Sequence, residues 1–421
     1  MRHALPLLLA AALVALAGCS AETDEAGSIQ PLPPEQETRE SELGPPGIRP
    51  LSQGPGDKNS PVWSPSGDRV AFVRDGYVVD KPPHSPETHR WTTRDFAAEK
   101  VLWSASGEEL FILAPEQSSG ARSESSGSQA GEELSIYETR SGEGELGVRR
   151  LADEVLAAGQ PPGGDPIVAA SRTGEYESQI SLLQQDGAAP SAYPETVEGR
   201  VTDLSVSQDG ERALLGVRAP ADGEGPDRFE VHTFDLSEGR AERVAQLESS
   251  LSLVGPPQEA SDGIYYVARE AEETREGGAA DGDGGDSGTQ LTLYHLPGGS
   301  EDPEPVLGTG EDSVVFSFQV SPEGGRIALL GRRDSGSPTN LYTLDLDTDT
   351  VETVTVNENM DIRTGPENLS WSADGERVVL VARNDISAPE VYDGSAATLL
   401  ADFYNLWEVP VADLEDEETG E

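Results

Sequence analysis

Short apolar runs separated by turn residues recur along most of this chain. Some runs are apolar at every position, as at residues 70–73 and 378–381, and strands of this kind are covered on both faces. Other runs alternate between apolar and polar residues, as at residues 341–346 and 351–356, which is typical of strands with one covered face. The pattern predicts an all-β protein built from short strands.

A unit of about eleven residues recurs, in which a large apolar residue precedes a serine and a glycine stands three positions after that serine. The apolar residues, which we call markers, are spaced by 40, 103, 114 and 51 residues. The two large gaps are about twice the small ones, and weaker copies around residues 167–183 and 263–267 occupy them. Seven units of roughly fifty residues match the period of a four-stranded propeller blade, or six if one weak copy is an insertion. The markers are Trp63, Trp103, Val206, Val320 and Trp371.

The serine and the glycine of each unit predict a tight turn between two strands. Proline, where it follows the serine, presets the first torsion angle of the turn, and glycine adopts the positive φ that a bulged hairpin needs. We therefore interpret these residues as structural. They are Ser64, Gly67, Ser104, Gly107, Ser207, Gly210, Ser321, Gly324, Ser372 and Gly375.

These units resemble the TolB-like, WD-like propeller repeats of bacterial envelope proteins, whose usual form is aromatic-Ser-Pro-Asp-Gly-x-x-Ile-Ala-Phe. The resemblance covers most of residues 50–412 and implies a single all-β propeller. TolB also carries an α/β domain before its propeller, whereas only a short segment precedes the first unit here. The resemblance therefore implies a fold and leaves the Tol partners open, since these residues build blades and a fold does not define a function.

The first nineteen residues have the pattern of an export signal. Arg2 and His3 precede an apolar run at residues 4–15, which is too short to cross a bilayer as a finished helix. The ending Leu16-Ala-Gly-Cys19 resembles the lipobox of bacterial lipoproteins, in which the cysteine is acylated and becomes the first mature residue. The resemblance implies a lipoprotein signal peptide at residues 1–18 and a membrane-lipid anchor on Cys19. The alternative is an ordinary signal peptide.

Composition divides the rest of the chain into three parts. Residues 19–48 are rich in Glu, Pro and Gly, which predicts a disordered acidic tether. Residues 49–412 contain the repeats and form the predicted propeller, with aperiodic loops at 117–132 and 270–288. Residues 413–421 read as a disordered acidic tail.

The charge and the cysteine content exclude several functions. The chain has 78 acidic and 29 basic residues, with a formal net charge of −49. Nucleic-acid binding and adsorption to anionic lipids both need a cationic surface. Cys19 is the chain's one cysteine, so the body has no disulfide, no cysteine metal site and no thiol catalyst.

Four histidines remain after the signal segment. His84 and His89 stand in a loop with proline neighbours, and two imidazoles could ligate a metal if a third ligand lay nearby; the alternative is a pair of solvated residues. We expect His232 and His295 to be surface or edge residues of outer strands. We therefore expect no metal site and no cofactor, although an acidic propeller channel could attract a divalent cation.

The acidic runs and the tryptophans each have a structural and a functional interpretation. Residues 281–286 and 345–349 contain three aspartates each, but they lack residues that an EF-type calcium loop requires. The tryptophans at marker positions are expected to pack between blades. Trp91 falls off the marker position and is the candidate for a ligand or partner contact.

The sequence predicts a monomeric, lipid-anchored propeller on the extracytoplasmic or periplasmic side of the cell membrane or outer membrane. We expect it to bind an envelope protein as a scaffold and not to be an enzyme. The Gly-x-Ser-x-Gly motif of a serine hydrolase is absent from the sequence. The alternative is a propeller enzyme with a channel-bound metal, of the lactonase or lyase type.

Overall fold

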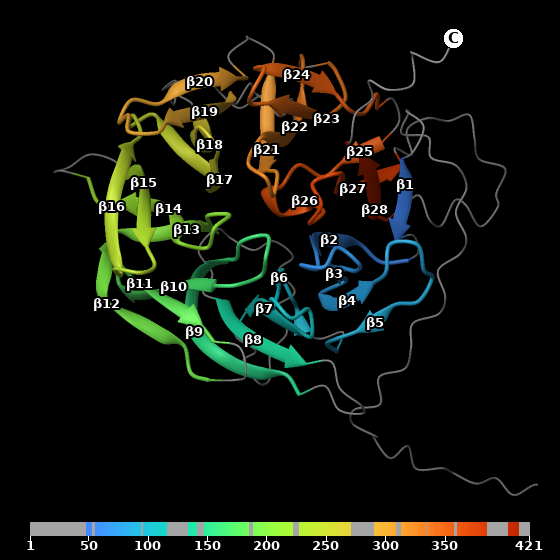
Figure 1. Ribbon diagram of the computed structural model, residues 1–421, viewed down its shortest axis with the longest axis horizontal. Coiled ribbons are helices and arrows are strands. Elements are labelled where there is room, and N and C mark those ends of the chain that lie inside the picture. Colours follow the sequence, from blue (N-terminus) through green and yellow to red (C-terminus); the bar gives the residue numbers. More distant parts are fainter. Residues whose placement is uncertain are drawn as a thin grey trace, which may run out of the picture.

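The computed structural model shows strands grouped into sheets that stand around a central axis (Figure 1). It describes residues 48–411 except for 53–54, 94–95, 116–133, 141–146, 185–187, 222–226, 271–289, 309–312, 335, 358–359 and 385–402. Within these residues, no helix has the length and apolar character that crossing a bilayer requires.

Four of the sheets are antiparallel meanders of four strands in chain order. One contains β2 (Lys58–Trp63), β3 (Val70–Arg74), β4 (Tyr77–Lys81) and β5 (His89–Arg90), and another contains β13 (Arg200–Val206), β14 (Arg212–Ala219), β15 (Arg228–Asp235) and β16 (Arg240–Gln246). The other two contain β17 (Leu251–Ala260), β18 (Gly263–Glu270), β19 (Leu291–Pro297) and β20 (Glu304–Leu307), and β21 (Val314–Val320), β22 (Arg326–Arg332), β23 (Asn340–Asp345) and β24 (Thr350–Thr353).

A fifth sheet has seven strands because one long strand belongs to both of its halves. The first half of β9 (Arg149–Gly159) pairs with β8, and its second half pairs with β10. The other strands are β6 (Lys100–Trp103), β7 (Glu109–Pro115), β8 (Leu134–Arg140), β10 (Ile167–Gly174), β11 (Glu177–Leu183) and β12 (Ser191–Glu198).

The last sheet joins the two ends of the described chain and so closes the ring. Its outermost strand is β1 (Arg49–Ser52), which pairs with β28 (Asn405–Pro410), and β28 pairs with β27 (Arg377–Asn384). The innermost position is shared by β25 (Met360–Ile362) and β26 (Leu369–Trp371), which lie on either side of the 3-10 helix η3 (Pro366–Asn368).

The five repeat turns share one geometry. Each repeat glycine has a φ between +68° and +76°, and its amide donates to the carbonyl of the repeat serine at 2.8–3.0 Å. The serine hydroxyl accepts the amide of the residue five positions later at 2.9–3.1 Å. Each of these serines is at most 2% exposed. The turn thus needs glycine for its torsion angle and a small hydroxyl side chain for a buried amide.

The core lies between the sheets. The buried apolar residues of the described chain form seven clusters, and each joins strands of neighbouring units. The marker tryptophans belong to these clusters, as expected. The indole of Trp103 donates to the carbonyl of Val62 on the neighbouring sheet at 3.1 Å. Trp371 makes the equivalent bond to Gln319 at 2.8 Å.

The ring has two different faces. The repeat turns lie beside one another on one face, which we call the turn face: a Cβ atom added to Gly67 would lie 3.8 Å from that of Ala373. Because strands alternate in direction, the connections from the second to the third strand of each unit lie on the opposite face, which we call the far face. β28 ends at the turn face, and its antiparallel partner β1 therefore begins there, at Arg49.

Candidate functional site

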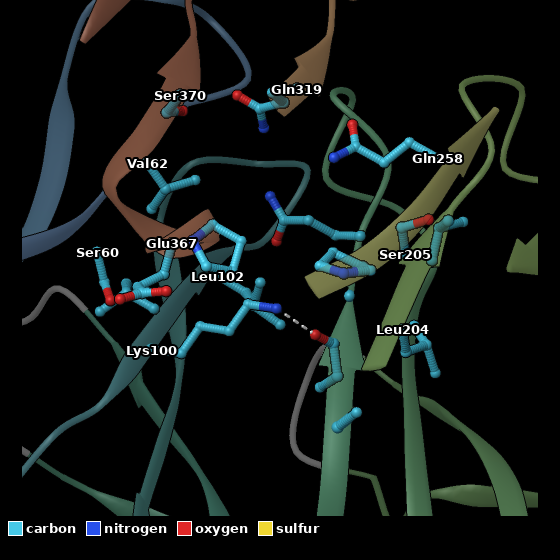
Figure 2. Close-up of a pocket in the computed structure, with 18 of the residues that line it drawn as sticks. Ser60, Val62, Lys100, Leu102, Leu204, Ser205, Gln258, Gln319, Glu367 and Ser370 are labelled. Atoms are coloured by element: carbon cyan, nitrogen blue, oxygen red, sulfur yellow. Dashed lines mark hydrogen bonds between the residues drawn. The ribbon is translucent and has the colours of Figure 1, made fainter. Parts of the chain in front are cut away.

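The first strands of the sheets surround a chamber on the ring axis, with a volume of about 630 Å³ (Figure 2). Its wall comes from β2, β6, the end of β9, β13, β17, β21 and the segment from η3 to β26. Every unit of the ring therefore contributes to this axial chamber.

One register position supplies polar side chains to this wall. The residue three positions before the marker is polar in all five clear repeats. The register of β2 and β13 shifts close to this position, and such bulges re-aim side chains. Three of the five residues line the axial chamber. The five are Ser60, Lys100, Asp203, Ser317 and Asn368.

Lys100 crosses part of the chamber to reach the neighbouring strand. Its Nζ atom donates to the carbonyl oxygen of Ala158 at 2.6 Å (Figure 2). Burial lowers the pKa of Lys100, and the negative charges of Asp203 and Glu367 act in the opposite direction. Burial penalises the charged form of an amine, so the neighbouring acids offset only part of this cost.

Asp203 is the acidic counterpart on β13. Burial raises the pKa of its carboxyl group, whereas a hydrogen bond with Thr202 and the charge of Lys100 lower it. Within the described residues, Asp203 and Lys100 form no ion pair with each other. The described chamber wall therefore contains one basic residue, Lys100, and four acidic residues, which are Asp203, Glu99, Glu259 and Glu367. Burial disfavours the charged form of both Lys100 and Asp203.

Two glutamines in the wall form hydrogen bonds with the backbone of neighbouring inner strands. Gln258 on β17 donates to the carbonyl of Phe318 at 3.1 Å and accepts the amide of Val320 at 2.9 Å. The Oε1 atom of Gln319 on β21 accepts the amide of Trp371 at 2.9 Å. These side chains link successive inner strands to each other.

The prediction of a partner contact at Trp91 is wrong. Its side chain is 2% exposed and packs edge-on against Trp103, with ring centroids 6.1 Å apart. The backbone amide of Trp91 donates to the carbonyl of Val78 at 2.9 Å. This bond extends the antiparallel pairing of β4 with β5 by one residue and holds the indole in the core.

The loop histidines do not meet a third ligand. His84 is exposed, and the Nδ1 atom of His89 lies 3.5 Å from a carboxylate oxygen of Asp80. The described residues contain no group of three or more His, Cys, Asp or Glu side chains that could hold a metal. The metal-dependent alternative is left as a prediction.

Of the two outer-strand histidines, His232 does not have the predicted environment. His232 is 8% exposed, and its strand β15 pairs with both β14 and β16, so its assignment as a surface or edge residue is wrong. Its Nε2 atom lies 2.8 Å from Glu230. Burial lowers the pKa of His232, and Glu230 opposes this shift. His295 is partly buried and stacks on Tyr265 with centroids 4.4 Å apart.

Several predicted features lie outside the described residues. They are Cys19, the signal segment 1–18, the tether up to residue 47, the aspartates at 281–286, most of the two aperiodic loops, and the tail 413–421. The lipid anchor and the tether therefore remain predictions.

The comparisons with known proteins show the fold. No protein-family model matches the chain, and no curated protein matches it in sequence. Hydrazine synthase of Kuenenia stuttgartiensis is similar in structure, with 12% identity and a TM-score of 0.56 over 86% of this chain and 97% of that chain. The β-propeller domain of the Trilobed protease from Pyrococcus furiosus has 12% identity and a TM-score of 0.51, over 86% of this chain and 99% of that chain.

A putative TolB from Agrobacterium tumefaciens is similar at a lower level, with 15% identity and a TM-score of 0.41, over 78% of this chain and 93% of that chain. The predicted all-β propeller class is confirmed. Because the similar structures include enzymes, the fold leaves open whether this chain is one.

Proposed function

We propose that this protein is a lipid-anchored binding propeller of the cell envelope. Acylated Cys19 would hold it to the cell membrane or the outer membrane, on the extracytoplasmic or periplasmic side. The far face of the ring would bind a partner protein, and the propeller would act as a scaffold of the TolB-like type.

The position of β1 is the observation that carries this proposal. β1 is the outermost strand of the closing sheet, and its first residue, Arg49, lies at the turn face. The chain that leads to Cys19 therefore joins the ring at the turn face. An anchor at that point favours an orientation in which the far face is directed away from the membrane.

The same strand supports a closed ring, which we propose to be monomeric. β1 pairs with β28 and so brings the two ends of the described chain into one sheet, of which β1 is the edge strand. We count seven blades, because β9 can serve as the last strand of one blade and the first strand of the next. Seven apolar clusters in the described chain fit this count, with one cluster at each junction between blades.

The anchor is tested by fractionating cells that carry Cys19→Ser. We expect this variant to leave the membrane fraction, since two or three buried acyl chains are what make such anchoring stable. A variant that stays in the membrane fraction would contradict the anchor.

The orientation is tested by site-specific photocrosslinking in intact cells. Ser249 and Asp334 are exposed on the far face, and Ser66 and Glu108 are matched exposed positions on the turn face. We expect a reproducible protein crosslink from the far-face pair only. A crosslink from the turn-face pair alone would refute the orientation. No crosslink from either pair, with stoichiometric metal in the purified protein, would favour the enzyme alternative.

A further inference from the structure

We propose that the axial chamber binds a small zwitterion, an amino acid or short peptide, with its carboxylate on Lys100 and its ammonium group on Asp203. This site goes beyond the scaffold function and does not depend on the anchor or on the orientation of the ring.

The chamber wall offers a group of each sign to such a ligand, with Lys100 as its basic residue and Asp203 as the acidic residue assigned to the ammonium group; Glu99, Glu259 and Glu367 also line it. Lys100 and Asp203 come from different inner strands, β6 and β13, and line the same chamber. A lysine ammonium has three donors, and the bond to Ala158 uses one of them. Within the described residues no ion pair joins Lys100 to Asp203, so each charge is open to a ligand group of opposite sign.

The strand between them, β9, packs closely against β13. β9 separates β6 from β13 around the ring and contributes Ala157, Ala158 and Gly159 to the wall. A Cβ atom at Gly159 would lie 2.9 Å from the Leu204 side chain and backbone, so a larger residue does not fit at this point. The chamber volume of about 630 Å³ falls within the range of roughly 300–1,000 Å³ that is usual for small-ligand pockets.

The energetic cost of the two charges supports the same ligand. Burial disfavours the charged form of both Lys100 and Asp203, and an uncompensated buried charge is destabilising. A zwitterion would place an opposite charge against each group at once. A simple cation or a simple anion would compensate only one of them.

The lysine content of the chain provides a direct measurement. Lys58, Lys81 and Lys100 are its three lysines, so labelling with [13Cε]lysine gives three NMR signals, and Lys100→Met assigns the one of interest. Lys58 and Lys81 are buried away from the chamber wall and serve as internal references. The probes are glycine, diglycine and triglycine at up to about 10 mM, so that dissociation constants in the millimolar range can be detected. The titrations are made near pH 6, where an amine is favoured in its charged form.

We expect at least one of these three probes to shift the Lys100 signal saturably, with the signals of Lys58 and Lys81 unmoved. N-acetylglycine, which lacks the ammonium group, and glycinamide, which lacks the carboxylate, should bind at least about tenfold more weakly. Asp203→Asn should abolish the shift, whereas Asp209→Asn, which removes an exposed carboxylate at the turn following the same strand, should preserve it.

Three outcomes would overturn the proposal. The first is that none of the three glycine probes shifts the Lys100 signal. The second is that glycinamide binds as tightly as the best zwitterion, which would indicate a cation site. The third is that N-acetylglycine binds as tightly as the best zwitterion, which would indicate an anion site. A shift that survives Asp203→Asn would also contradict the assigned role of this carboxylate.

Discussion

Three glycines of the repeat turns allow the torsional cost of the turn to be separated from the cost of a steric clash. Gly107 has a φ of +71°, and an added Cβ would have no atom within 4 Å. Gly210 has a φ of +73°, but its Cβ would lie 2.8 Å from Pro166. Gly325 is not among the glycines with positive φ, and its Cβ would also meet open space. The other clear repeats have Asp or Glu at the position of Gly325.

The expected free energies follow from these geometries. Gly107→Ala should cost about 1–2 kcal/mol, the penalty of a left-handed conformation for a residue with a Cβ. Gly325→Ala should stabilise by about 0.4–1 kcal/mol, because alanine restricts the unfolded chain. Gly210→Ala should cost more than Gly107→Ala, since the Pro166 ring must also move. The gap between the first two variants is therefore about 2 kcal/mol.

Thermal unfolding followed by tryptophan fluorescence can resolve this gap. An unfolding entropy of about 2.1 cal/mol/K per residue over roughly 360 residues gives about 0.75 kcal/mol/K, so about 2 kcal/mol corresponds to about 3 °C in Tm. The expected order of Tm is Gly325→Ala highest, then Gly107→Ala, then Gly210→Ala. If Gly325→Ala lowers Tm as much as Gly107→Ala does, positive φ is not what the repeat glycine supplies.

Three further measurements test the packing and the chamber. Trp103→Phe removes the indole bond to Val62 and should cost about 1–3 kcal/mol in denaturant unfolding; an unchanged midpoint would show that this bond contributes nothing. Leu51→Ala truncates a buried residue of the closing strand and should cost about 2–5 kcal/mol; a loss below about 0.5 kcal/mol would contradict its role in closing the ring. Asp203→Asn should stabilise the protein at neutral pH, because the folded-state pKa of Asp203 is raised and wild type loses stability as the pH rises above 3.8 and through that pKa. A variant that is less stable than wild type at neutral pH would indicate a structural ion pair instead.

The sequence predicted those parts of the fold that local chemistry determines. The serine and the glycine of the repeats act within six residues of each other, so their pattern alone indicated the turns. Trp91 was misassigned because its environment comes from Trp103 and Val78, which the local sequence does not reveal. The continuous β9 was not anticipated either, since its pairing with both β8 and β10 depends on where two sheets meet.

The roles of Lys100 and Asp203 in the chamber wall were not predicted, although the sequence contains a signal for them. Alignment of the repeats on their markers places Lys100 and Asp203 at the same register position, where the other repeats have Ser60, Ser317 and Asn368. Polar residues at one fixed position of every repeat indicate a shared environment. Only the structure shows that this environment is the ring axis, and that three of the five side chains line one chamber.

The chain forms ion pairs between neighbouring sheets where their geometry allows it. Arg212 on β14, for example, lies 2.5 Å from Glu259 on β17. The separation of Lys100 and Asp203 therefore does not reflect a general inability to pair charges across the ring. Lys100 and Asp203 are both partly buried and line the same chamber, yet they form no ion pair with each other. The proposed ligand of matching charges would account for this arrangement, which the stability of the ring alone does not explain.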